Sequence, residues 1–213
     1  MYNRYILAQE ELREKIIVED FLPEKIETVG GVDQAFISED NKVVSCAIVL
    51  AYPSMELIEE RFSLMGVDFP YVPGLLAYRE GPSVLAAYGK LENKPDVLLI
   101  DGQGIAHPRG VGIASHIGVV LDKPTIGVAK KRLVGEYTVP GKAGECSRLT
   151  YNGKLIGFVL KTKEGCRPLF ISPGHKVSPE KALGIVSSCI RGHKLPEPVR
   201  IAHTRVDACK TDL

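Results

Sequence analysis

The chain has 213 residues, of which 45% are hydrophobic and 25% are charged, and its formal net charge is +1. This balance is ordinary for a globular α/β protein with one substantial core, and it excludes a polycation that binds nucleic acid through bulk charge. No apolar run is long enough to cross a bilayer, and the N-terminus lacks the apolar core of a signal peptide. The five scattered cysteines form no C-x-x-C pair, which favours free thiols in a reducing cytoplasm. We therefore expect a single cytoplasmic domain over residues 1–213.

The first part of the chain shows one helical pattern followed by three strand patterns. Apolar residues recur on one helical face over residues 5–20, which predicts an amphipathic helix. Strands are predicted at Thr28–Asp33, Val43–Leu50 and Met55–Met65. Because no helix separates them, they favour an antiparallel meander.

Prolines and glycines mark the elements of the middle of the chain. A helix is predicted to start near Leu75, and Pro82 is expected to open a second helical segment that ends near Leu91. The apolar run that ends at Ile100 predicts a buried strand, and a helix should follow over residues 110–122. The short apolar run Thr125–Ala129 is typical of a buried parallel strand.

The last third adds a hairpin, a strand and two helices. Asn152-Gly153 is a strong hairpin turn, and a strand should end at His175. Ser178 and Pro179 suit the start of a helix that runs to about Arg191, and Pro196 begins the last one. The whole pattern predicts a mixed sheet, with an antiparallel meander and parallel strands, flanked by helices.

Three acids lie at or beside the ends of predicted apolar elements: Asp33, Glu80 and Asp101. Magnesium is usually held by one or two carboxylates, and its remaining sites go to water and phosphate oxygens. Such an ion can orient water and stabilise the leaving oxygen at a phosphorus centre. The alternative is that Asp33 and Asp101 only cap turns, as acids often do. Either of these two alone favours turn capping, whereas the two together, each after an apolar run, leave a metal site equally open.

The segment after Asp101 is rich in glycine, and Gly102 and Gly104 would let a ligand approach the backbone closely. An acid before such a turn indicates a metal-dependent enzyme that acts on a phosphate-bearing substrate. Lys130 follows a predicted strand and could neutralise a phosphate in the transition state. It opens the densest basic cluster, residues 130–132, although charge alone favours a solvated face there.

Two histidines have contrasting patterns. His107 lies in the glycine-rich turn and is expected to be exposed to a ligand. His203 shares a helical face with Val199 and Val206, so the pattern alone favours a satisfied core histidine.

The loop Phe69–Pro73 has two interpretations. It is a surface turn packed by its own rings, or it is a stiff wedge whose Tyr71 enters a base stack and holds a duplex open. In the second case Gly74 and the glycines after Asp101 would leave space for an extruded base.

These motifs occur together in an order that resembles the endonuclease V family, and the resemblance covers nearly the whole chain, from about Asp33 to His203. The motifs that carry it are Gly30-Gly-Val-Asp33, Pro70-Tyr-Val-Pro-Gly-Leu-Leu-Ala-Tyr-Arg-Glu80, Asp101-Gly-Gln-Gly-Ile-Ala-His107-Pro-Arg109, Gly127-Val-Ala-Lys130, Ser172-Pro-Gly-His175 and Arg200-Ile-Ala-His203.

The resemblance implies an RNase H-like fold and a DNA repair endonuclease that acts at deoxyinosine, the product of adenine deamination. It implies cleavage of the second phosphodiester bond on the 3′ side of the lesion, with Mg²⁺ or Mn²⁺, to leave 3′-hydroxyl and 5′-phosphate ends. Backbone N–H groups of glycines could read the hypoxanthine carbonyl. The partner would be DNA, and a monomer is expected.

The resemblance also implies roles for individual residues. The metal-binding carboxylates would be Asp33, Glu80 and Asp101, and the other catalytic residues would be Lys130 and His203, against the pattern-based interpretation of that histidine. The strand-separating wedge would be Pro70, Tyr71, Val72 and Pro73. The base pocket would include Gly74, Leu76, Gly102, Gly104 and Leu133. Nucleic-acid contacts would come from His107 and Arg109.

Two alternatives stay open. Some members of the family prefer inosine in RNA, so the chain is alternatively an endoribonuclease. It is also conceivable as an inosine-binding module without catalysis, although such a binder has no need of Asp33, Glu80, Asp101 and His203 together.

Overall fold

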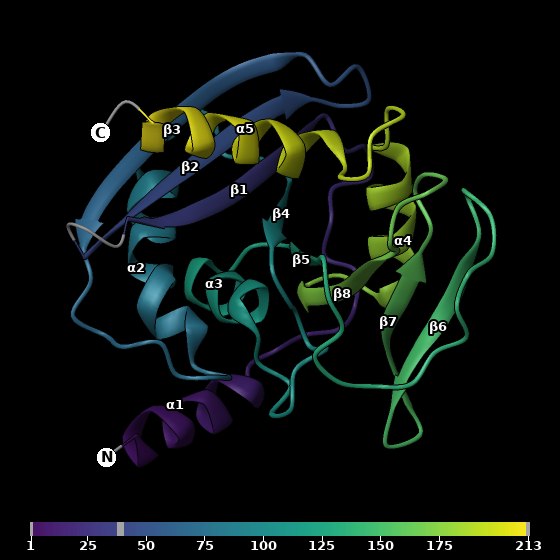
Figure 1. Ribbon diagram of the computed structural model, residues 1–213, viewed down its shortest axis with the longest axis horizontal. Helices are drawn as coiled ribbons and strands as arrows, with labels where there is room; N and C mark the ends of the chain where they lie inside the picture. Colours follow the sequence, from purple (N-terminus) through teal and green to yellow (C-terminus); the bar gives the residue numbers. More distant parts are fainter. Residues whose placement is uncertain (1, 38–40, 212–213) are drawn as a thin grey trace.

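The computed structural model describes residues 2–37 and 41–211. Its centre is one eight-stranded sheet in the order β3-β2-β1-β4-β5-β8-β7-β6 (Figure 1). The strands are β1 (Thr28–Ile37), β2 (Lys42–Ala51), β3 (Leu57–Gly66), β4 (Val97–Asp101), β5 (Thr125–Ala129), β6 (Cys146–Tyr151), β7 (Lys154–Leu160) and β8 (Leu169–His175).

The sheet is mixed, as the sequence predicts. β1, β2 and β3 form an antiparallel meander, whereas β1, β4 and β5 pair in parallel. A second antiparallel group, made of β8, β7 and β6, continues the sheet from β5. β4 and β5 end beside the middle of β1, which continues to Ile37 paired with β2 alone, so side chains at the ends of β4 and β5 lie close to those in the middle of β1.

Helices cover both faces of this sheet (Figure 1). α4 and α5 pack on one face, α2 and α3 pack on the other, and α1 lies beside α3. Within the described ranges no helix is both long and apolar enough to cross a membrane. The helices are α1 (Asn3–Arg13), α2 (Leu76–Gly89), α3 (Ile113–Leu121), α4 (Pro179–Ser188) and α5 (Glu197–Thr211).

The two faces follow from the alternation of side chains along each strand. In β2, Cys46 and Ile48 join the core under α4 and α5, whereas Ala47 and Val49 join the core under α2 and α3. Because nearly every position of this strand is buried, β2 has a continuous apolar sequence rather than an alternating one.

The first helix is shorter than predicted. α1 ends at Arg13, whereas the apolar periodicity extends to residue 20. The backbone of Ile17 is instead engaged by the end of β8: its N–H donates to His175 Nδ1 at 3.2 Å, and its carbonyl accepts from the N–H of Lys176 at 2.7 Å. Tertiary hydrogen bonds therefore replace the last turns of the predicted helix.

The prediction that Pro82 opens a separate helical segment is wrong, because α2 runs through it without a break. Proline removes one helical hydrogen bond, but the neighbouring turn is held by the sheet. Ser63 Oγ on β3 donates to the carbonyl of Ser83 at 2.7 Å, and Gly81 and Val84 are buried. Packing against β2 and β3 thus outweighs the local effect of the proline.

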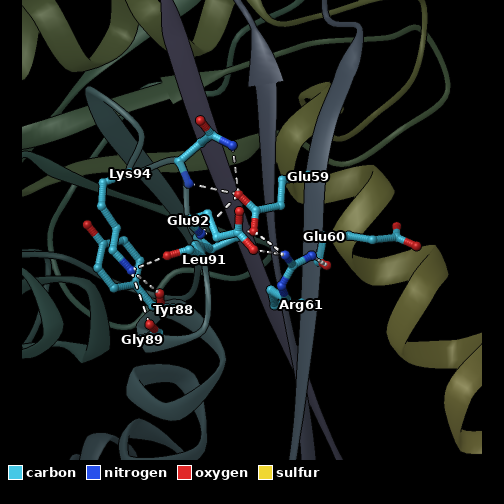
Figure 2. A network of polar contacts seen from close by, with 9 residues as sticks. Glu59, Glu60, Arg61, Tyr88, Gly89, Leu91, Glu92 and Lys94 are labelled. Atoms are coloured by element: carbon cyan, nitrogen blue, oxygen red, sulfur yellow. Dashed lines mark hydrogen bonds and ion pairs between the residues drawn. The ribbon is translucent and has the colours of Figure 1, made fainter.

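A network of charges holds the C-terminal end of α2 (Figure 2). Lys94 Nζ donates to three carbonyl oxygens of the last turn and the segment after it, those of Tyr88, Gly89 and Leu91. A cation is favourable at this end of a helix dipole.

Glu59 on β3 completes this network (Figure 2). Its buried carboxylate accepts from the backbone N–H groups of Asn93 and Glu92 and pairs with Arg61 at 2.8 Å. Hydrogen bonds from Asn93 and Glu92 hold the pKa of the Glu59 carboxyl below its usual value. This buried acid is fully provided with donors.

Candidate active site

Two acids meet where the parallel pairing of β1 with β4 ends, at the last residue of β4 and in the middle of β1. Val32 is paired with Ile100, so the next residues, Asp33 and Asp101, lie side by side. Both occupy positions that point toward the α5 face, since Val29 and Leu99 belong to the core under α4 and α5.

A cation and a histidine face these acids. Lys130 follows β5 and its Nζ donates to Asp101 Oδ2 at 2.6 Å. His203 on α5 places Nδ1 2.5 Å from Asp33 Oδ2. Four of the predicted catalytic residues are therefore joined in two pairs at one edge of the sheet.

His203 is not a core histidine, so the interpretation from the helical pattern alone is wrong. Its side chain is 41% exposed and lies over the middle of β1, at Asp33. The cause is a close approach of α5 to β1: a Cβ on Gly31 would lie 2.0 Å from the carbonyl oxygen of Pro198. Only glycine permits this approach, which brings the His203 ring to Asp33.

The Asp33 carboxyl is electrostatically unfavourable in its ionised form. Burial raises its pKa to about 6, and the neighbouring charge of Asp101 adds to the rise, while the hydrogen bond with His203 opposes it. Two carboxylates forced together in this way favour a proton or a cation between them.

Glu80 approaches the same edge from α2, on the other face of the sheet. Its Oε2 accepts from Gln34 Nε2 at 3.0 Å. Burial raises the pKa of Glu80 to about 7, and Asp33 and Asp101 contribute to this rise. Gln34 itself keeps one buried oxygen, Oε1, without a hydrogen-bond partner among the described residues.

These groups fit a divalent cation, although not as a closed cage. In residues 2–37 and 41–211 no three His, Cys, Asp or Glu side chains are arranged as a ready-made metal site. Magnesium needs only one or two carboxylates, and the Asp33–Asp101 pair supplies two whose mutual repulsion a cation would relieve. The Glu80 carboxylate, hydrogen-bonded to Gln34, carries a third negative charge that acts on the same centre from the other face of the sheet.

A pocket of about 130 Å³ opens near this centre, and we call it the Gly74 pocket. Four of the residues predicted for the wedge or the base pocket line it: Tyr71, Gly74, Leu76 and Leu133. Its remaining lining residues are Gln9, Ala77, Gln103, His107, Val111, Gly112 and Ile113. Tyr71 is 69% exposed at its rim, as a wedge residue should be.

Gly102 and Gly104 do not line the Gly74 pocket. The N–H of Gly102 donates to Val128 O, and that of Gly104 donates to Ser172 Oγ. Neither N–H group is therefore free for a base in this structure, and the part of the two glycines in the base pocket stays a prediction. A Cβ on Gly104 would lie 2.0 Å from Pro173 O, so this glycine permits close packing against β8.

The prediction that His107 is exposed is also wrong. The residue is 5% exposed, and burial lowers the pKa of its imidazole to about 4. Its Nδ1 accepts from the backbone N–H of Arg109. His107 forms part of the wall of the Gly74 pocket in its neutral form.

The guanidinium of Arg109 makes hydrogen bonds to other residues of the protein. It donates to Gly74 O at 2.6 Å and to Gln9 Oε1 at 2.7 Å, and Gln9 Nε2 also donates to Gly74 O. Gln9 is 1% exposed and ties α1 to the turn that follows the wedge. Sequence reasoning missed Gln9, and a glutamine on the otherwise apolar face of a helix was the available signal.

A basic pocket of about 330 Å³ adjoins Lys130, and we call it the Arg167 pocket. It is lined by Lys130, Lys131, Arg132, Tyr137, Arg167, Pro168 and Phe170. The basic cluster at residues 130–132 thus begins beside Asp101 and lines a concave surface, rather than lying on a flat solvated face. Arg167 joins it because the start of β8 lies beside the end of β5.

Comparison with known proteins gives one consistent result. A sequence model of the endonuclease V family matches residues 10–204. Endonuclease V of Dehalococcoides mccartyi (strain BAV1) is 48% identical over 199 residues, which cover 93% of this chain and 89% of that protein.

Solved structures agree. The crystal structure of endonuclease V from Bacillus subtilis is 33% identical, with a TM-score of 0.94 and coverage of 100% of this chain and 93% of that chain. Endonuclease V of Ciona intestinalis, solved with a 24mer DNA containing an inosine followed by a ribo-adenosine, is 29% identical, with a TM-score of 0.83 and coverage of 99% and 97%. The predicted RNase H-like fold is confirmed by these matches, and the chain belongs to the endonuclease V family of nucleases.

Proposed function

We propose that this nuclease recognises deoxyinosine in DNA and hydrolyses the second phosphodiester bond on the 3′ side of the lesion, leaving 3′-hydroxyl and 5′-phosphate ends. The observation that carries the proposal is the juxtaposition of an acidic centre with a small pocket beside an exposed tyrosine. A base held in the Gly74 pocket would leave the neighbouring phosphates free to reach Asp33 and Asp101. The relative from Ciona intestinalis, which binds DNA containing inosine, supports the same substrate.

The acids would hold Mg²⁺, for which Mn²⁺ can substitute. When bound, the cation supplies charge stabilisation at the phosphate and a more acidic water. Asp33 and Asp101, together with Glu80 from the opposite face of the sheet, are the residues that would bind it. The raised pKa values of Asp33 and Glu80 indicate that a bound cation would stabilise the ionised form of these carboxyls.

Lys130 and His203 would act beside the cation. Lys130 is partly exposed and hydrogen-bonded to Asp101, so its ammonium can turn from that carboxylate toward a phosphate oxygen. Asp33 holds Nδ1 of His203 and thereby fixes the orientation of the ring, whose Nε2 lies 3.5 Å from Oδ2 of the exposed Asp207. The Arg167 pocket offers three further cations for the strand that crosses this edge.

The test is cleavage of an end-labelled duplex with one deoxyinosine, with Mg²⁺ and with EDTA. A matched duplex with adenine at the same position is the control. We expect a single nick two phosphates beyond the lesion on its 3′ side, only with the metal. Asp101→Ala should still bind the inosine duplex but should not cut it, and cutting by this variant would contradict the metal role of Asp101.

RNA is the second candidate substrate. The ribo-adenosine after the inosine in the Ciona intestinalis complex places a ribose on the 3′ side of the base in a relative. Parallel assays on DNA and RNA of the same sequence distinguish the two, and a strong preference for ribose at this position would favour RNA. Binding without any cleavage, in every divalent metal, would instead support an inosine-binding module.

We also expect the protein to be cytoplasmic and monomeric. Sedimentation of the free protein measures its oligomeric state.

A further inference from the structure

Gln103 stands between the Gly74 pocket and the catalytic segment. Its side chain lines the pocket, and its Nε2 donates to the carbonyl oxygen of Lys131 at 2.8 Å. A carbonyl only accepts hydrogen bonds, so this contact determines which end of the amide is nitrogen. The other end of the amide must present Oε1, an acceptor.

That acceptor is left without a donor. Gln103 Oε1 is shielded from solvent and has no hydrogen-bond partner within the described residues. Buried polar atoms are nearly always paired, and an unpaired one reduces stability. An unpaired acceptor on a residue that lines a pocket is therefore a candidate for a ligand that brings its own donor.

The opposite kind of group lies on another wall of the same pocket. α2 begins at Leu76, and the residue before it, Leu75, gives no side-chain cap. The first N–H groups of a helix have no partner inside the helix, and Leu76 and Ala77 both line the pocket. The residues that line the pocket thus include the first residues of α2, whose N–H groups have no partner inside the helix, and Gln103, whose Oε1 has none among the described residues.

A donor wall and an acceptor wall suit the edge of a base that carries an N–H next to a carbonyl. Hypoxanthine has this edge, with an N1–H donor beside the O6 acceptor. Adenine has the reverse, because its N1 is an acceptor and its C6 carries an amino donor. Bases extruded into a pocket are read by hydrogen bonds along this edge.

We propose that Gln103 Oε1 accepts a hydrogen bond from N1–H of the extruded hypoxanthine, so that Gln103 is a specificity-determining residue that rejects adenine. The tether to Lys131 O prevents the amide from turning to offer its NH₂ group instead. This inference rests on the proposed function and names the base contact within that site.

The experiment measures kcat/KM for wild type and Gln103→Met on two duplexes. One contains deoxyinosine, and the other contains deoxynebularine, whose purine lacks both O6 and the N1–H. Met has a similar length and no amide. We expect Gln103→Met to lower cleavage at deoxyinosine by about 10-fold or more, because the base would keep a buried donor without an acceptor. Wild type should cleave deoxynebularine poorly, because its N1 is an acceptor like that of adenine, and Gln103→Met should not lower this cleavage further.

An equal loss of kcat/KM on both duplexes would mean that Gln103 only supports the fold of the site. No loss of kcat/KM on either duplex would mean that Gln103 does not contact the base. Both results overturn the proposal. A second measurement needs no variant: wild type should cleave a duplex with 1-methyldeoxyinosine poorly, and cleavage as efficient as at deoxyinosine would also overturn it. If wild type does not cleave deoxyinosine at all, the proposed function fails, which is distinct from failure of the Gln103 contact.

Discussion

Two glutamates near α2 differ in the hydrogen bonds and the charges that surround their carboxylates. Glu59, beside the C-terminal end of the helix, accepts hydrogen bonds from two backbone N–H groups and pairs with Arg61. Glu80, within the helix, has one hydrogen bond from Gln34 and two nearby negative charges. The pKa of Glu59 is lowered, whereas burial raises that of Glu80 to about 7.

The difference indicates which acid serves structure and which serves chemistry. A carboxylate that is fully provided with donors needs nothing further, and Glu59 holds the end of α2 in place (Figure 2). A carboxylate that lacks donors and faces like charges is stabilised by a cation from outside. Asp33 belongs to the second kind, since burial and Asp101 raise its pKa to about 6.

The largest expected effect on cleavage comes from Asp33→Asn. This change removes one of the two adjacent carboxylates and should lower kcat by about 100-fold or more, as expected when a group that stabilises the transition state is lost. The free energy of unfolding in EDTA should not fall at neutral pH, because the variant also removes a repulsion with Asp101. Urea titration of the metal-free variant checks this, and a marked loss of stability would show that Asp33 is structural.

Glu80→Gln should lower cleavage less and should stabilise the metal-free protein. The folded-state pKa is raised, so the ionised carboxylate opposes folding, and wild type loses stability as pH rises from 4.5 to about 7. The neutral amide should recover about 1–3 kcal/mol above pH 7. Unfolding of both proteins in EDTA from pH 4 to pH 8 measures the difference. A gap that does not grow with pH would contradict the assignment.

Glu59→Gln should have the smallest effect on chemistry and the opposite effect on stability. Its lowered pKa means that the ionised form favours folding, so the variant should melt at a lower temperature above pH 4.5, and the gap should close as pH falls further. Specific activity at 25 °C should stay within about 2-fold of wild type, since the site lies away from the acids of β1 and β4. A large loss of activity in the folded variant would remove the distinction between the two acids.

Several parts of the site could be predicted from the chain alone. Asp33, Asp101 and Lys130 come directly after apolar runs in the sequence, and strands that pair in parallel bring the ends of such runs close together. The exposed Tyr71 sits in a proline-braced loop whose stiffness is a local property. These predictions depend on periodicity, on proline and on the geometry of a parallel sheet, which act over a few residues.

Other parts depend on neighbours that are distant in sequence. His203 reaches Asp33 only because Gly31 lets α5 approach β1, and His107 is buried because α1 covers the turn that contains it. The glycines after Asp101 serve close packing and have no free N–H groups. α2 continues through Pro82 because β2 and β3 support it.

The sequence by itself thus determined the mixed sheet and the acids that follow its apolar runs, because the apolar pattern of a strand and the turn residues that limit it are local properties of a few residues. The tertiary structure alone decided which polar atoms are satisfied. Both amide atoms of Gln9 are hydrogen-bonded, Gln34 and Gln103 each keep an oxygen without a partner among the described residues, and Glu59 and Glu80 have opposite pKa shifts. Whether a buried polar atom finds a partner depends on groups brought to within about 3 Å of it by folding, and residue type does not contain that information.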